Sequence, residues 1–267
     1  MRDRILACLA FFLSLVFPGS LLAGSARIVF PGQFLFDLQE ATVEGWVLFD
    51  FDPAQVETGV WRGMGAWFEF TAPKRENDLG ASFSLIYGLK ATGRRTTSGS
   101  ACYQRVGFSI EGKEVPHPSL LDCTSWGKNT WHHVAVTWKD GRNLVIYVDG
   151  QQVDRRQYPW SIVRDIPSLA QVVIGFTGYI AKNAVAVDEV RISQVARNPK
   201  ELGFFTLPLK PDPATLLLEN FENLSEKNGK LSTRPEVIAV ISAPTEYPVI
   251  GGKIIPGKAG KGLLLYP

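Results

Sequence analysis

The sequence of 267 residues is poor in the residue types from which most catalytic and metal sites are built, with three His, three Cys and two Met. Two of the three His are the neighbours His132 and His133, and no Gly-x-Ser-x-Gly sequence occurs, so a nucleophilic triad is not expected. No spacing offers the ligands that zinc needs, there is no EF-hand loop, and Gly59–Gly65 lacks the Lys-Ser/Thr end of a phosphate loop. These absences favour a binding protein over an enzyme.

An excess of charge of one sign is also missing. The chain has 28 Lys and Arg against 26 Asp and Glu, which gives a formal net charge of +2. Such a balance creates no strong field that would recruit a polyanion, so neither nucleic acid nor an anionic membrane is expected as a partner.

A hydrophobic run long enough to span a membrane is not found at the N-terminus, where Ile5–Phe17 is shorter than the roughly 20 residues required. Arg2 and Arg4 precede this run, and the small residues Ala23–Ala26 follow it. The pattern is typical of a secretory signal peptide, residues 1–26, with cleavage after Ala26 or after Ala23. The mature chain is therefore expected to be secreted or periplasmic, without a membrane span.

Removal of the signal peptide also removes Cys8 and leaves Cys102 and Cys123. An even number of Cys in an exported chain predicts one disulfide, which would close the loop between these two residues. The alternative, two free thiols in a reducing compartment, requires that the signal-peptide interpretation is wrong.

Periodicity points to an all-β sandwich, because long segments with a 3.6-residue period are scarce and Gly and Pro turns are many. The stretch Trp131–Gly150 contains the most informative pattern. Val134, Val136 and Trp138 alternate with more polar residues in a first strand, and Leu144–Val148 forms the second strand of a hairpin. Asp149-Gly150 is the next turn, and Gln151-Gln152-Val153 begins another strand. A short helix is expected from Asn198-Pro199 to Leu202, and residues 90–130 are expected to be the least regular part.

Several segments together resemble the laminin-G-like modules of the concanavalin-A-like jelly-roll superfamily. They are the Trp-His-His-Val start at Trp131, the Val-Asp-Gly end at Val148–Gly150, the Ile-Gly pair at Ile174, the Asp-Glu-Val-Arg-Ile strand at Asp188–Ile192, and the core strand Thr42–Val47. The resemblance covers residues 27–205 and implies a jelly roll of two antiparallel sheets.

The remaining residues, 206–267, begin with a Pro-rich linker and continue with Thr215–Phe221, which looks like the first strand of such a module. The end of the chain, Gly257–Pro267, parallels Ser25–Pro31. This C-terminal part either supplies strands that complete the jelly roll or begins a second, truncated module. We expect Thr215–Phe221 to pair near the strand Val187–Ser193.

Glycan hydrolases of this superfamily carry two cooperating acids on one strand, in a Glu-x-Asp-x-x-Glu arrangement. That spacing does not occur here. Asp188 and Glu189 are adjacent, so in a regular strand they are expected to point to opposite faces. A glycoside hydrolase is therefore the least favoured function.

No cofactor is required, although a structural Ca²⁺ is possible because jelly rolls of this superfamily often hold one. The candidate ligand is Asp188, together with Asp37 or Glu219. In the alternative interpretation, Asp188 caps backbone N–H groups.

The aromatic residues divide into two groups. Trp46, Trp131 and Trp138 lie in alternating strands and are expected in the core. Trp126, Tyr158 and Trp160 lie in loop-like segments, the last two close to Arg155 and Arg156, where they either bind sugar rings or seal the ends of the sandwich. The favoured function is an exported, non-catalytic binding or adhesion module for glycan or another cell-surface or matrix component. The alternative is a structural or surface-assembly protein.

Overall fold

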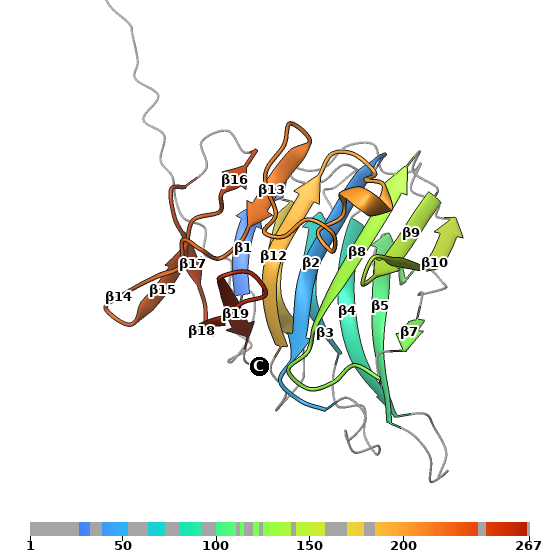
Figure 1. Ribbon diagram of the computed structural model, residues 1–267, viewed down its shortest axis with the longest axis horizontal. Coiled ribbons are helices and arrows are strands. Elements are labelled where there is room, and N and C mark those ends of the chain that lie inside the picture. The colour runs from blue at the N-terminus through green and yellow to red at the C-terminus, as the bar shows by residue number, and fades with distance from the viewer. Residues whose placement is uncertain are drawn as a thin grey trace, which may run out of the picture.

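The computed structural model describes residues 27–32, 39–52, 64–72, 81–91, 100–110, 113–114, 120–122, 125–139, 143–157, 170–178, 185–239 and 244–265. Two large antiparallel sheets pack face to face in this part of the chain, and the C-terminal strands lie together at one end of the sandwich (Figure 1). This is the all-β sandwich of two sheets that the sequence predicts.

The first sheet has seven strands within the described residues, with the order β1-β11-β3-β4-β5-β6, and β7 also pairs with β5. The bounds of its strands are β1 Arg27–Pro31, β3 Met64–Ala72, β4 Ala81–Ala91, β5 Ser100–Ile110, β6 Lys113–Glu114, β7 Leu120–Asp122 and β11 Gln171–Gly178.

The second sheet has nine strands within the described residues, with the order β10-β9-β8-β2-β12-β13-β16; β19 also pairs with β12, and β18 pairs with β19. Strands β14, β15 and β17 form a separate small sheet. The bounds are β2 Ala41–Phe49, β8 Trp131–Lys139, β9 Asn143–Val148, β10 Gln151–Gln157, β12 Val185–Ser193, β13 Thr215–Glu219, β14 Ser225–Lys227, β15 Lys230–Thr233, β16 Val237–Ile238, β17 Tyr247–Val249, β18 Lys253–Pro256 and β19 Lys261–Leu265.

The core lies between the two large sheets and follows from the alternation of residues along each strand. Val43 and Val47 of β2 point into it and belong to one buried cluster with Phe68 and Phe70 of β3. Glu44 and Trp46 lie on the other side of β2, which we call the outer face of the nine-stranded sheet. Both faces of this sheet are covered, since all residues of β2 and all residues of β12 are buried.

The predicted hairpins are confirmed. Strands β8 and β9 pair antiparallel from Val134–Val148 to Lys139–Asn143, and β9 and β10 are joined by Asp149-Gly150. These two turn residues have φ angles of 48° and 76°, the left-handed values that a tight hairpin turn needs.

The expected pairing of the C-terminal strand is also found. Strand β13 pairs with β12 between Val190–Glu219 and Ser193–Thr215. Strand β19 pairs with the first part of β12, from Val185–Leu265 to Val187–Leu263. Two strands from residues 215–265 therefore lie end to end along one edge of β12 and join its side chains in the main core.

Within residues 90–130, the described part includes the long regular strand β5, which begins at Ser100 and pairs with β4 over its whole length. The polar segment 92–99 lies outside the described residues. The expected short helix is a 3₁₀ helix, Pro199–Glu201. In the described part of the chain, no helix has the length and hydropathy needed to cross a membrane.

Candidate functional site

Residues 194–214, here called the crossing segment, connect β12 to β13 and carry the 3₁₀ helix across the outer face of the nine-stranded sheet (Figure 1). Leu202 of this segment packs against Ala135 and Tyr147 of the sheet. The crossing segment therefore covers the part of the outer face formed by β2, β8 and β9.

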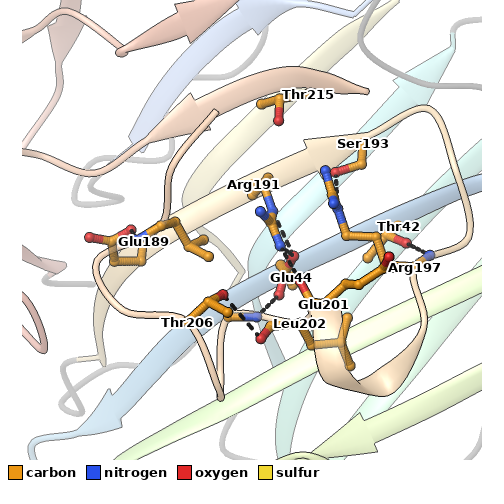
Figure 2. A network of polar contacts seen from close by, with 12 residues as sticks. Thr42, Glu44, Glu189, Arg191, Ser193, Arg197, Glu201, Leu202, Thr206 and Thr215 are labelled. Atoms are coloured by element: carbon orange, nitrogen blue, oxygen red, sulfur yellow. Dashed lines mark hydrogen bonds and ion pairs between the residues drawn. The ribbon is translucent and has the colours of Figure 1, made fainter. Parts of the chain in front are cut away.

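Glu44 holds the middle of the crossing segment on the sheet. Its carboxylate is fully buried and accepts a hydrogen bond from Arg191 Nε at 2.7 Å and another from the Gly203 backbone N–H at 2.6 Å. The Nε2 atom of His133 lies 3.0 Å from Glu44 Oε2. Since an ionised carboxylate only accepts, His133 donates here through Nε2. Figure 2 shows Arg191 and Glu44 joined on the outer face, with the crossing segment in front of them.

The charge of Glu44 is well compensated. Burial by itself raises the pKa of this carboxyl, but the hydrogen bond from His133, the charge of Arg191 and the Gly203 N–H together hold its pKa below the ordinary value. Glu44 and Arg191 are also directly opposite each other in the pairing of β2 with β12. The network is therefore a buried ion pair whose remaining acceptor positions are satisfied, as a buried charge requires.

A second contact holds the beginning of the crossing segment. The Thr42 hydroxyl donates to Val195 O at 2.7 Å and accepts from Arg197 N–H at 2.9 Å. The Arg197 side chain donates to Ser193 Oγ at 2.8 Å and forms an ion pair with Asp212 at 2.8 Å (Figure 2 shows Arg197 beside Thr42 and Ser193). The hydrogen bond from Arg197 lowers the pKa of Asp212 to about 2. The crossing segment is thus fixed to both β2 and β12.

The expectation that Asp188 and Glu189 point to opposite faces is wrong. The register of β12 with β2 shifts between Asp188 and Arg191, and Glu189 has a φ of 51°. This β-bulge inserts an extra residue, so Asp188 and Glu189 both lie between the core residues Val187 and Val190. Both carboxyls therefore contact the segments that cover the outer face.

The two carboxyls of the bulge bind backbone groups. Asp188 accepts hydrogen bonds from Glu189 N, Lys258 N and Ala259 N at 2.7–3.0 Å, and Glu189 accepts one from Leu209 N at 2.9 Å. Asp188 thus caps backbone N–H groups, which is the alternative to a calcium ligand. The two residues are only 0% and 1% exposed, so this pair of acids is not accessible to a substrate.

The described residues contain no group of three or more His, Cys, Asp or Glu side chains arranged to hold a metal ion. Glu219, the second candidate for calcium, accepts hydrogen bonds from Phe221 N at 2.8 Å and from the Thr233 hydroxyl at 3.1 Å. Asp37, the third candidate, lies outside the described residues.

An exposed aromatic ring lies near the middle of the crossing segment, two residues after Gly203. Phe205 is 56% exposed, the largest value among the exposed large hydrophobic residues of the described chain. Its ring packs edge-on against Phe204 with centroids 5.0 Å apart, and Phe204 in turn stacks on Trp46 at 6.0 Å. A Cβ atom on Gly150 would lie only 2.7 Å from an atom of each ring. Because Gly150 has no side chain, both rings can pack against the β9–β10 turn.

The same β9–β10 turn carries a partly exposed carboxylate. Asp149 has a side chain that is 37% exposed, lies 2.8 Å from His132 Nδ1 and accepts from His133 N at 2.9 Å. Burial raises its pKa, but these two hydrogen bonds outweigh burial and the pKa is lowered. Asp149 is therefore an ionised acceptor next to the glycine on which Phe205 rests. We call Phe204, Phe205, Asp149 and Gly150 the aromatic corner.

Of the two roles expected for Trp126, the structure agrees with the one that seals the end of the sandwich and not with an exposed ring for sugar binding. Trp126 is 7% exposed and belongs to the main core, where it stacks on His132 at 4.2 Å and on Phe49 at 5.5 Å. The ring seals one end of the sandwich, so sequence position in a loop was a poor guide to its burial.

The other predicted binding residues lie on or after the edge strand β10. Arg155 is exposed and Arg156 pairs with Leu144 of β9, while Tyr158 and Trp160 lie outside the described residues. Neither Arg155 nor Arg156 belongs to the aromatic corner. Strand β10 does begin next to this corner, because its first residue, Gln151, follows Gly150 in the sequence. For the predicted disulfide, Cys102 lies in β5 and Cys123 is outside the described residues.

Neither the aromatic corner nor the Glu44–Arg191 pair is predicted from the sequence. The adjacent phenylalanines Phe204-Phe205 follow a predicted helix end, which is a signal that they could cover a neighbouring surface. Glu44 is the one charged residue of β2 and Arg191 the one cation of β12, and opposite charges in two buried strands are a signal for a cross-strand pair.

Comparison with known families agrees with this architecture. The profile described as the concanavalin A-like lectin/glucanases superfamily, Laminin_G_3, matches residues 22–203. The chain therefore belongs to this superfamily, within its laminin-G-like group. No curated protein matches the sequence.

Solved structures with a similar arrangement include two botulinum neurotoxins and a galectin. Botulinum neurotoxin type C is 12% identical with a TM-score of 0.37, over 61% of this chain and 34% of that chain. The receptor-binding domain of botulinum neurotoxin D is 9% identical with a TM-score of 0.39, over 66% of this chain and 39% of that chain. Sheep galectin-11 in complex with glycerol is 6% identical with a TM-score of 0.34, over 64% of this chain and 98% of that chain. All three scores are below 0.5, so these similarities carry no conclusion about a ligand.

Proposed function

We propose that this protein is an exported, non-catalytic module that binds glycan, and that the aromatic corner contacts the sugar. The superfamily to which the chain belongs is described as one of lectins and glucanases. The observation that carries the proposal is Phe205, a ring that is 56% exposed on a segment fixed by buried hydrogen bonds. Residues on connecting segments that a rigid scaffold holds in place are where binding sites are concentrated.

The chemistry of the aromatic corner suits a saccharide. The C–H face of a sugar ring is apolar and can stack on Phe205, while its hydroxyl groups can donate to the Asp149 carboxylate. Asp149 is kept ionised by its two hydrogen bonds and still has free lone pairs to accept others. Tyr158 and Trp160 follow β10 and stay predicted as further ligand contacts, together with Arg155 and Arg156.

A glycan array probed with the mature chain, compared with its Phe205→Ala variant, tests the proposal. We expect binding to a defined set of glycans that weakens at least tenfold in the variant, with an unchanged melting temperature. The matched control is Ile250→Ala, because Ile250 is 51% exposed but lies in the C-terminal part away from β10. Binding that is equal in all three proteins would place the site elsewhere.

The alternative function is a structural or surface-assembly protein, and the exposed apolar residues Val153 and Phe205 favour it as the second candidate. Exposed apolar side chains near an edge strand are a usual route to self-association. Light scattering across a hundredfold range of protein concentration separates the two functions. A mass that rises with concentration and returns to the monomer value in Phe205→Ala would favour assembly.

The proposal also includes the absence of hydrolysis. Asp188 and Glu189, the adjacent acids of β12, are buried and occupied by backbone donors. We therefore expect no release of reducing ends from β-glucans. A release that is lost in Glu189→Gln would identify the protein as an enzyme instead.

Export and the disulfide belong to the same proposal. Cys102 lies in β5 and Cys123 lies outside the described residues, so the bridge stays predicted from the even number of Cys in an exported chain. The intact mass of the exported protein should rise by two hydrogens on reduction. A titration that finds two free thiols in the native protein would contradict the bridge.

A further inference from the structure

The part of the crossing segment that presents Phe205 is held at both ends by a buried carboxyl. At one end Gly203 N–H donates to Glu44 at 2.6 Å, and at the other end Leu209 N–H donates to Glu189 at 2.9 Å. Residues 204–208, here called the aromatic span, lie between these two anchors. The position of the Phe205 ring therefore depends on both carboxyls.

The two anchors differ in the charges around them. Glu44 is paired with the Arg191 guanidinium and hydrogen-bonded to His133. Glu189 is equally buried but has no cationic partner in the described part of the chain, because Arg191 is turned to Glu44. The ammonium groups of Lys258 and Lys261 are also engaged elsewhere, over the Trp46 ring and with Glu222 O.

The neighbours of Glu189 are acidic instead. Asp188 precedes it on β12, and both Glu222 and Glu236 act on it from the C-terminal strands and turns. On the crossing segment itself, Lys210 is exposed and Asp212 is paired with Arg197. An ionised Glu189 thus adds one more negative charge to a dry, negative environment, which is costly.

A proton on Glu189 relieves this cost. Both oxygens of Asp188 accept N–H groups, three in all. Glu189 accepts one through Oε2, and its Oε1, which accepts no hydrogen bond from the described residues, can carry the hydrogen. Burial, followed by the charge of Asp188, raises the pKa of Glu189 to about 7 against the opposing effect of the Leu209 N–H. Burial also raises the pKa of Asp188 to about 7, so the hydrogen bonds, and not the pKa values, make Glu189 the member of the pair that is better placed to hold the proton.

We propose that Glu189 is a proton-controlled anchor of the aromatic span. With its proton, the carboxyl stays buried and fixes Leu209 to β12. Once it is ionised, the carboxylate draws water into the bulge, the contact with Leu209 weakens and the aromatic span opens. The link to ligand binding rests on the proposed function of Phe205, but the opening of the span does not.

Hydrogen exchange measured by mass spectrometry on the full mature chain tests the anchor. Protection factors, corrected for the intrinsic effect of pH, should fall about tenfold or more for residues 204–210 between pH 5.5 and pH 8.5, since each pKa unit is a factor of ten. Glu189→Gln keeps an acceptor oxygen without a titrating charge, so its protection should not change with pH. Glu226→Gln, on the exposed strand β14, is the matched control and should behave as the unmodified protein.

A protection of residues 204–210 that is independent of pH in the unmodified chain would overturn the proposal, as would an unaltered dependence in Glu189→Gln. Should that variant fail to fold, a carbon NMR titration of the Glu189 carboxyl in the unmodified protein decides the question. A midpoint near 7 supports the anchor, and an ordinary midpoint near 4.5 contradicts it.

Glycan binding measured at the same two pH values separates the two proposals. Tighter binding at pH 5.5 supports control of the site by Glu189. Equal affinity at both values, with changing protection, would overturn that control. Changing protection without binding to any glycan would leave the anchor intact and reject the proposed function.

Discussion

Strands β2 and β12 are neighbours of equal length and both are completely buried, yet the buried carboxyl of β2 has a cationic partner and the two of β12 do not within the described residues. In β2 the single acid, Glu44, meets Arg191 across the strand pair and keeps a low pKa. In β12 the acids Asp188 and Glu189 share a bulge without a cation and have raised pKa values. A regular strand with a paired charge holds its contact at any ordinary pH, whereas the bulge places two carboxyls on one side and makes their contacts dependent on protons.

The largest change in stability is expected when the C-terminal strands that pair with β12 are removed. Truncation after Pro208 deletes β13 and β19, including the buried side chains Leu217, Leu218, Leu263 and Leu265. Burying side chains of this size contributes about 1.5 to 3 kcal/mol each, so residues 27–208 should melt at a much lower temperature and aggregate through the open edge of β12. Calorimetry of both chains measures the effect. Equal melting temperatures would mean that the C-terminal strands are an independent unit.

The next largest loss of stability is expected when the ion pair of Glu44 in β2 with Arg191 in β12 is broken. Arg191→Met leaves the Glu44 charge buried and without its partner, which should lower the free energy of unfolding by about 3 to 5 kcal/mol. Urea denaturation measures this loss, with Lys200→Met on the exposed part of the crossing segment as the control. The double variant Glu44→Gln/Arg191→Met should recover much of the loss. A cost of Arg191→Met below about 1 kcal/mol would show that the ion pair is not what holds the crossing segment.

The smallest effect concerns pH and separates the two strands directly. Burial raises the pKa values of Asp188, Glu189 and Glu219 to about 7, so the folded protein keeps protons that the unfolded chain has lost. The free energy of unfolding should therefore fall as pH rises from about 4, the ordinary pKa of these carboxyls, to about 7, their pKa in the folded protein. The lowered pKa of Glu44 acts in the other sense, and its contribution is lost only when the pH falls below about 4.

Urea denaturation at pH 5 and pH 8 measures the difference, and Glu189→Gln should reduce it. Stability that is equal at both values, or higher at pH 8, would contradict the raised pKa values of β12.

Much of the fold follows from local patterns in the sequence. The alternation of Val134, Val136 and Trp138 and the turn Asp149-Gly150 predict the β8–β9–β10 hairpins because both signals depend only on neighbouring residues. The pairing of β13 with β12 could be predicted because the apolar run at Leu216–Leu218 needs a surface to cover it.

The candidate site could not be derived in the same way. The bulge at Asp188-Glu189 breaks the alternation on which the prediction relied, and only the partners from residues 209 and 258–259 reveal it. Glu44 and Arg191 are 147 positions apart, so their contact depends on the order of strands in the sheet. Trp126 is buried by the packing of a loop against His132, which local composition does not determine.

The arrangement of β19 also has a mechanical consequence. Its three pairs with β12 run from Leu265–Val185 to Leu263–Val187, so the residue nearest the C-terminus forms the first pair. A pulling force transmitted through the chain beyond Leu265 would load these pairs one after another, and β19 would peel from β12 at low force instead of shearing as a unit. Peeling would then reach the turn at Lys258 and Ala259, whose N–H groups are bound by Asp188. That carboxyl is the point at which tension from the C-terminal side would first meet resistance from the centre of the sheet.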